Sequence, residues 1–128
     1  MARIYAASSW RNPHQPAIVA LLRKAGHEVY DFRNPFNGRP GFAWREIDPN
    51  WQNWTAEQYR EFVTTHPIAA AGYVSDLRAM EWADTCLLIL PCGRSAHLEA
   101  GWFCGRGKRC IILTCDGEEP ELMALLAT

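Results

Sequence analysis

The stretch from Leu87 to Trp102, LLILPCGRSAHLEAGW, places the strongest constraint on how this chain can fold. It opens inside an apolar run, Cys86 to Leu90, that is typical of a strand buried on both faces. The sequence PCG breaks this run, and Ser95 can then cap a helix that extends to about Gly105. The order strand, tight turn and helix indicates an α/β protein, in which ligands bind where parallel strands end and helices begin.

Glu99 is the first chemically informative residue of this stretch, because it follows the turn closely. We expect it in the first turn or so of the helix, where the helix dipole favours its ionised form. An ionised carboxylate at the end of a strand can act as a nucleophile. The alternative is that Glu99 only complements the dipole, as acidic residues in first turns often do.

The composition describes one globular domain and excludes several classes of partner. The chain has 128 residues, 48% of them hydrophobic and 21% charged, with a net charge of −1. This charge provides no field that would attract a nucleic acid polymer or an anionic membrane. No apolar run approaches the roughly 18 residues that span a bilayer, and the N-terminus lacks the apolar centre of a signal peptide.

The cysteines indicate a reducing compartment. There are five, an odd number, and most lie on or beside the expected core strands. This favours free thiols and a cytoplasmic location. The chain contains neither a CxxC pair nor a Cys/His spacing typical of zinc, so we expect no metal site.

The remaining pattern predicts a single doubly wound parallel sheet of four to five strands flanked by helices. The first strand, helix and second strand follow one another with short connections, which implies a right-handed crossover. We expect the strand order 2-1-3-4 in one domain covering residues 1–128. The predicted strands span 3–7, 27–32, 85–90 and 109–115, and the predicted helices span 14–25, 55–65, 68–83 with an interruption at Gly72, 95–105 and 121–127.

A Trp-rich insert at about 33–54 separates the second strand from the next helices. It holds three prolines, two glycines and three tryptophans, without a sustained period. A loop of this length is usually functional or disordered, and its aromatic content argues against disorder. Trp44 or Trp51 can stack on a nucleobase, but tryptophans of an insert more often serve packing or an oligomer interface.

Two polar loops follow the first and third strands, which are neighbours in the predicted sheet. The first loop contains Ser8, Ser9, Trp10 and Arg11, and the second contains Gly93, Arg94 and Ser95. Hydroxyls, arginines and main-chain amides before a helix form an anion cradle, although each loop alone is also compatible with ordinary helix capping. Neither the P-loop nor the dinucleotide-binding glycine pattern is present.

Asp76 precedes the third strand on a predicted helix and can pair with Glu99. Two carboxyl groups, one a nucleophile and the other a proton donor, are the usual equipment for cleaving a glycosidic bond. The alternative for Asp76 is a solvated helix residue.

These residues occur in an order that resembles the nucleoside 2-deoxyribosyltransferase superfamily. The similar segments are IYAASSW, Asp76 with a following AD, GRSAHLEAGW with its Glu-x-Gly sequence, and GKRCIIL. The resemblance implies a flavodoxin-like sheet, a homodimer or larger homo-oligomer, and cleavage of the N-glycosidic bond of nucleosides or their 5′-monophosphates without metal or cofactor. It also implies that Glu99 is the nucleophile, that Asp76 is the acid, and that Tyr5 belongs to the active site.

One departure from the family pattern concerns the sugar 5′ end. Transferases of the family carry an Asp six residues before the nucleophile, and this chain has Gly93 there. The change argues against transfer between free nucleosides and favours hydrolysis of a 5′-monophosphate, whose phosphate is held by hydroxyls and main-chain amides. The proposed glycosyl intermediate can be resolved by water or by a second base. The alternative function is a non-catalytic module that binds a nucleotide or a nucleotide-derived signal.

Overall fold

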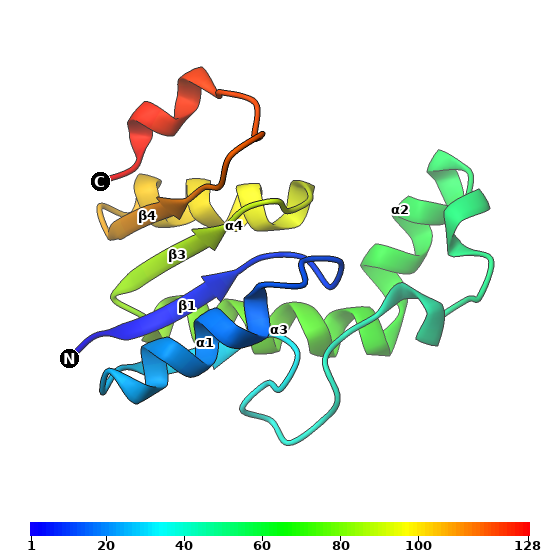
Figure 1. Cartoon of the computed structure of the whole chain (residues 1–128). Coiled ribbons are helices and arrows are strands. Elements are labelled where there is room, and N and C mark those ends of the chain that lie inside the picture. The colour runs from blue at the N-terminus through cyan, green and yellow to red at the C-terminus, as the bar shows by residue number, and fades with distance from the viewer. The chain divides into compact units, whose positions relative to one another are not determined.

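The computed structural model describes all 128 residues and contains one four-stranded parallel sheet. The strand order β2-β1-β3-β4 confirms the predicted order 2-1-3-4 (Figure 1). The strands are β1 (Arg3–Ala7), β2 (Glu28–Asp31), β3 (Thr85–Ile89) and β4 (Arg109–Leu113). The helices are α1 (Gln15–Lys24), α2 (Ala56–Thr65), α3 (Pro67–Trp82) and α4 (Arg94–Gly105), with short 3-10 turns at Trp44–Glu46, Trp51–Asn53 and Leu122–Leu126.

The chain forms two compact units. The first comprises Met1–Asp31 and Ala79–Thr128 and contains the whole sheet together with α1 and α4. The second comprises Phe32–Arg78 and contains the Trp-rich insert, α2 and most of α3. The residues that follow β1 and β3, where we expect the ligand, belong to the first unit.

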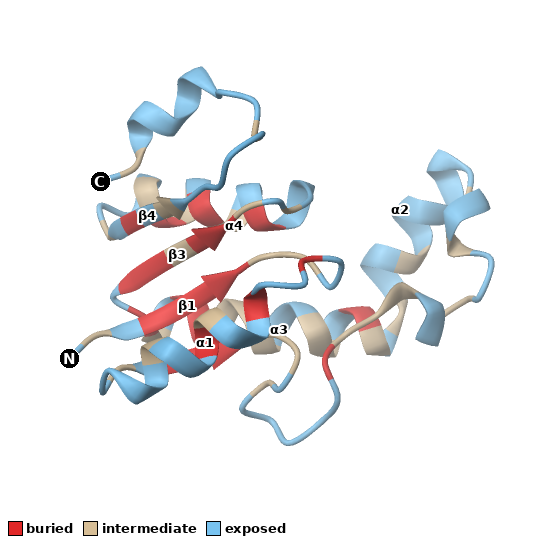
Figure 2. Cartoon of the chain, viewed as in Figure 1, coloured by how far each residue is buried: buried red, intermediate tan, exposed pale blue.

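The core of the first unit lies on both faces of the sheet, because successive side chains of each strand alternate between them. On one face Ile4, Ala6 and Val29 pack with Val19 of α1. On the other face the buried aromatic rings of Tyr5 and Phe103 bring β1 together with α4. Figure 2 shows the buried residues concentrated on the central strands and on the side of α4 that packs on the sheet.

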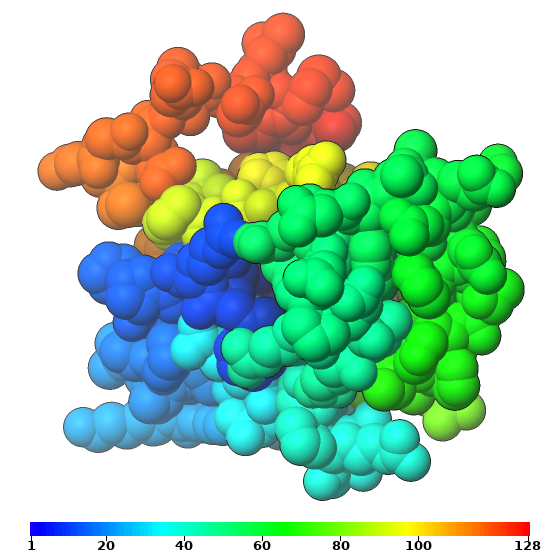
Figure 3. All heavy atoms as spheres, turned by 90° about the vertical axis from the view of Figure 1, so that its right-hand side faces the viewer, coloured from blue at the N-terminus to red at the C-terminus, as the bar shows by residue number.

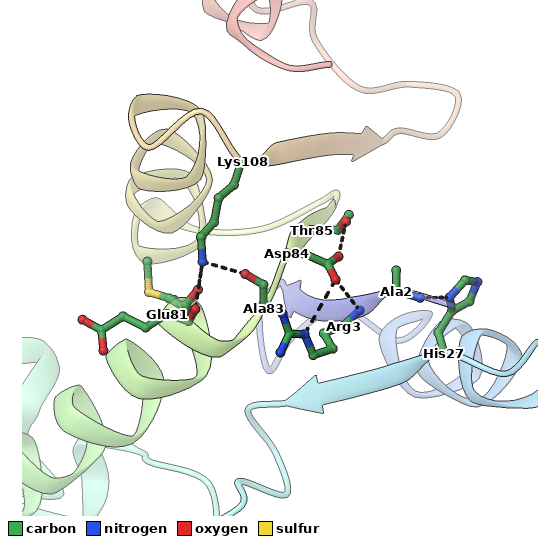
Figure 4. Close-up of polar contacts among 9 residues, drawn as sticks. Ala2, Arg3, His27, Glu81, Ala83, Asp84, Thr85 and Lys108 are labelled. Carbon is green, nitrogen blue, oxygen red and sulfur yellow. Dashed lines mark hydrogen bonds and ion pairs between the residues drawn. The ribbon is translucent and has the colours of Figure 1, made fainter.

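Polar contacts join the strands at their amino ends (Figure 4). The main-chain amide of Arg3 donates to Asp84 Oδ2 at 3.1 Å, and the Thr85 hydroxyl donates to Asp84 Oδ1 at 2.8 Å. Lys108 Nζ donates to three carbonyls at the end of α3, including that of Ala83 at 2.6 Å. Asp84 therefore links the start of β1 to the start of β3. These amino ends of the strands are opposite the carboxyl ends, where the ligand site is predicted.

The second unit begins its first helix as predicted. Thr55 Oγ1 accepts from the Gln58 amide at 3.1 Å, and Gln58 Oε1 accepts from the Thr55 amide at 2.9 Å, which together form a capping box. The predicted interruption at Gly72 is wrong, because α3 runs continuously through this residue. A Cβ at Gly72 would lie 3.1 Å from the Phe42 side chain, so the glycine provides room for a ring and does not break the helix.

The tryptophans of the insert form an aromatic cluster within the second unit. Trp44 lies edge-on to Phe42 at 4.7 Å and to Trp54 at 5.8 Å, measured between ring centroids. Trp54 also contacts Phe62 of α2 at 4.7 Å, and its ring N–H donates to Asp48 Oδ2 at 2.7 Å. These contacts give Trp44 the packing role that was the alternative to stacking on a base, and Trp54 packs with it.

The chain end differs from the prediction. The expected helix over 121–127 is a single 3-10 turn, Leu122–Leu126, whose large apolar side chains are exposed. An α-helix this short gains stability only by packing an apolar face, and these side chains have no such contact. The segment is held to β4 at its end, where the Thr128 amide donates to the Cys110 carbonyl at 2.7 Å.

All five cysteines are free thiols in the structure. A thiol reagent applied to the unfolded protein without prior reduction should therefore titrate five groups, because no two cysteines are joined. A count of three or fewer in freshly purified protein would contradict this. Separately, none of the helices has the length and apolar content that crossing a bilayer requires.

Candidate active site

Tyr5 and Glu99 meet at the centre of the first unit. Tyr5 lies on β1 with 1% of its surface exposed, and its hydroxyl donates a hydrogen bond to Glu99 Oε2 of α4. Glu99 itself is a partly exposed residue. The structure therefore brings together two of the three residues that the sequence predicts to be catalytic.

Burial, and not the helix dipole, determines the charge of Glu99. The helix α4 begins at Arg94 with Gly93 as its N-cap, so the predicted cap at Ser95 is wrong and Glu99 lies in the second turn. The dipole acts mainly within the first turn. Burial raises the pKa of Glu99 to about 8, while the hydrogen bond donated by Tyr5 opposes this by stabilising the ionised form. A desolvated carboxylate of this kind is a stronger nucleophile once ionised.

The loops after β1 and β3 converge, as predicted, and hydrogen bonds hold them together. Ser8 Oγ donates to the Ile89 carbonyl at 2.9 Å. The side-chain amide of Asn12 donates to the carbonyls of Ile89 and Pro91, at 3.3 and 3.2 Å. Figure 3 shows the β1 loop in dark blue beside the start of α4 in yellow.

Asn12 is a site residue that sequence reasoning missed. Only 1% of its surface is exposed, and its side-chain oxygen also accepts from the His14 amide at 2.8 Å. Asparagine commonly bonds to main-chain groups in turns, and this was the only available signal. Because Ser8 uses its single proton on Ile89, it can act toward a ligand only as an acceptor.

The middle of the first loop faces outward. Ser9 Oγ accepts from the Arg11 amide at 3.2 Å, and the Ser9 carbonyl accepts from the Asn12 amide at 3.0 Å, which forms a tight turn. Trp10, half exposed, and Arg11 extend from this turn. The loop thus has an inner side that binds the neighbouring loop and an outer side that offers an indole and a guanidinium group.

The predicted residues of the second loop lie on different sides of α4. Successive residues of an α-helix are rotated by about 100°. Ser95 is therefore about 40° from Glu99 around the axis, whereas Arg94 is about 140° away. Arg94 lines a shallow pocket with Cys92, Gly93, His97 and Leu98. Ser95 consequently shares the side of Glu99, and Arg94 must use its length to reach the same ligand.

Two further polar side chains are buried near the carboxyl ends of the strands. Gln15 at the start of α1 donates from Nε2 to Asp31 Oδ1 of β2 at 2.8 Å. Both side chains are at least 95% buried. No spacing in the sequence distinguished them from surface residues. Asp76, the third predicted catalytic residue, is a partly exposed residue of α3 in the second unit, and its pairing with Glu99 stays a prediction.

Comparison with known proteins supports the fold. No family model and no curated protein matches this sequence. Among solved structures, the chain is similar to the 2-deoxyribosyltransferase of the psychrotolerant bacterium Bacillus psychrosaccharolyticus, with a TM-score of 0.61 and 22% sequence identity. The similarity covers 94% of this chain and 77% of that one. It shows a shared fold and confirms the α/β parallel-sheet architecture that the sequence resemblance implied.

Proposed function

We propose that this chain is a member of the nucleoside 2-deoxyribosyltransferase superfamily that cleaves the N-glycosidic bond of a (deoxy)nucleoside or nucleoside 5′-monophosphate. The observation that carries this proposal is the buried Tyr5 hydroxyl donating to the carboxylate of Glu99. The fold shared with a 2-deoxyribosyltransferase supports it.

The proposed reaction begins with attack of Glu99 on the anomeric carbon. A carboxylate oxygen forms an ester bond to C1′ while the C1′–N bond breaks and its electron pair passes to the base nitrogen. Asp76 gives its proton to the departing base, which leaves as a neutral molecule. Tyr5 orients the attacking carboxylate and stabilises its charge before the attack.

The ester is resolved in a second step. Water, or the nitrogen of another base, attacks C1′ and releases Glu99 as a carboxylate, and the ionised Asp76 accepts the proton of the attacking group. Water gives hydrolysis and a base gives transfer. All of these groups are side chains of this chain, so the proposed reaction uses neither metal nor cofactor.

The proposed function is tested with a panel of ribo- and deoxyribonucleosides and their 5′-monophosphates. The protein is incubated with each compound, with and without a second free base, and the products are separated by chromatography. Release of base alone indicates hydrolysis, and formation of a new nucleoside indicates transfer. No released base from any compound would refute the proposal.

The loops support a preference for phosphorylated ligands. Gly93 stands where a carboxylate would repel a phosphate, and we expect the exposed Arg11 and Arg94, with Ser9 and Ser95 beside them, to hold the phosphate. Trp10, half exposed beside Arg11, is the residue that we expect to stack on the base.

Replacing either arginine should selectively weaken the binding of phosphorylated ligands. A charge-assisted hydrogen bond contributes about 1.5–3 kcal/mol, so Arg11→Ala or Arg94→Ala should raise the Kd of a 5′-monophosphate by about ten- to a hundredfold. The Kd of the matching nucleoside should hardly change. Titration calorimetry measures both, with Arg39→Ala in the insert as a control. Equal losses for both ligands would mean that the arginines have structural roles.

One observation favours a binding module as the second candidate. A carboxyl group with a pKa near 8 is mostly neutral at pH 7, and a neutral Glu99 can donate a hydrogen bond to a bound nucleotide. Such a module does not need Asp76 as a proton donor. Tight binding of a nucleotide without any release of base would favour this function.

The family resemblance further suggests a homodimer or larger assembly. The exposed side chains of the last 3-10 turn support self-association, since exposed apolar patches often mark interfaces. Leu122 and Leu125 are 78% and 84% exposed. Sedimentation of the purified protein over a range of concentrations would determine the oligomeric state.

A further inference from the structure

The ring of Tyr5 is held between two other aromatic rings. Tyr30 of β2 stacks on Tyr5 with ring centroids 5.2 Å apart and an angle of 16° between the ring planes. Phe103 of α4 contacts Tyr5 at 5.7 Å and 41°. All three residues are at least 99% buried.

These rings connect the two elements that carry the Tyr5–Glu99 hydrogen bond. Tyr5 and Tyr30 are directly paired in the parallel register of β1 and β2, so their side chains share one face of the sheet. Phe103 is four residues after Glu99 and therefore lies one turn further along the same side of α4. The helix that presents the carboxylate thus also presents a ring that fixes its hydrogen-bond donor.

We propose that Tyr30 is a positioning residue, which together with Phe103 holds the Tyr5 hydroxyl on Glu99 and so determines the strength of that hydrogen bond. The catalytic part of this inference rests on the proposed function, whereas the effect on Glu99 does not. Tyr30 stacks on the Tyr5 ring, and this contact is the route by which we expect it to act on Glu99.

The physical reason is that a hydrogen bond depends steeply on distance and angle, while an aromatic ring next to a space can turn about its side-chain bonds. Shortening Tyr30 to leucine leaves one side of the Tyr5 ring without contact. The Tyr5 hydroxyl then spends less time on Glu99, and the ionised carboxylate loses its donor in a desolvated site. Tyr30→Phe keeps the stacked ring and should preserve the geometry.

The test measures the ionisation of Glu99 directly, by NMR of carboxyl carbons in labelled protein without ligand. Tyr30→Leu should raise the pKa of Glu99 by about one unit, since the lost bond is charge-assisted. Tyr30→Phe should leave it near the wild-type value. In turnover, Tyr30→Leu should lower kcat about tenfold on the acidic side of the pH profile with little change in KM.

A double-mutant cycle separates positioning from general destabilisation. In a Tyr5→Phe background the hydroxyl is absent, so adding Tyr30→Leu should not raise the pKa of Glu99 further. The inference is overturned if the shift is equally large without the hydroxyl, or if Tyr30→Leu lowers the melting temperature but leaves this pKa unchanged. Phe103→Leu provides the same comparison if Tyr30→Leu does not fold. Wild-type protein that releases no base would refute the proposed enzyme, while the NMR result would still decide the inference.

Discussion

Glu99→Gln should lower turnover by at least about a thousandfold while the protein remains folded. Glutamine keeps the size of the side chain and its oxygen can still accept from the Tyr5 hydroxyl, but it cannot form the glycosyl ester. Ligand affinity should change little, because the ester forms only after binding. Single-turnover base release by the wild type and the variant measures the effect, with the exposed Glu119→Gln as a matched control.

The same substitution should change how stability depends on pH. Burial raises the pKa of Glu99 from its ordinary value of 4.5 to about 8. At pH values between these two pKa values, the unfolded chain releases the Glu99 proton more readily than the folded chain. The free energy of unfolding of the wild type therefore falls by up to about 1.4 kcal/mol for each unit that the pH rises. The hydrogen bond from Tyr5 reduces this loss.

Glutamine does not ionise, so Glu99→Gln should be the more stable protein at pH 9, with the difference vanishing near pH 4. Denaturant unfolding at both pH values measures this. A variant that unfolds at every pH would assign Glu99 to the scaffold. The same ionisation predicts that kcat/KM of the wild type rises with pH toward about 8, since only the ionised carboxylate attacks.

Asp76→Asn should slow turnover by about 10²- to 10⁴-fold for bases that are poor leaving groups. Such bases depend on a proton donor, whereas a substrate with an electron-poor leaving group can depart without one. Asparagine has nearly the same shape as aspartate but no transferable proton. The ratio of rates for good and poor leaving groups, compared with Asp116→Asn as a control, measures the effect. Equal slowing for all leaving groups would show that Asp76 does not protonate the base.

The parts of the fold that follow from local sequence patterns were predictable from sequence. The strand order follows from short β-α-β connections and right-handed crossovers, and the capping box at Thr55 is a local pattern. The reason for Gly72 within α3 was not predictable, because the ring of Phe42 that occupies the space beside it is about 30 residues away in the chain. The final 3-10 turn was not predictable for the same reason, since only packing decides whether such a segment becomes a helix.

In the candidate site, too, some features were predictable from sequence and others were not. Glu99 could be named from the sequence because it follows a strand, a turn and a helix start that the pattern reveals, and Tyr5 could be named from the family resemblance. The charge state of Glu99 could not be predicted, because the helix cap lies two residues earlier, at Gly93, which moves Glu99 out of the first turn and leaves burial as the cause of its pKa shift. Asn12 and Gln15 were missed because their burial is a property of the folded loop and not of their neighbours in sequence.

Mass spectrometry of the protein during turnover tests the proposed mechanism most directly. Wild-type protein mixed with the nucleotide that the panel identifies and quenched in acid within milliseconds should carry the added mass of the sugar phosphate. Proteolysis should locate the adduct on the peptide that contains Glu99, and Glu99→Gln should carry none. Base release by the wild type with no adduct at any time, or an adduct on another residue, would contradict attack by Glu99.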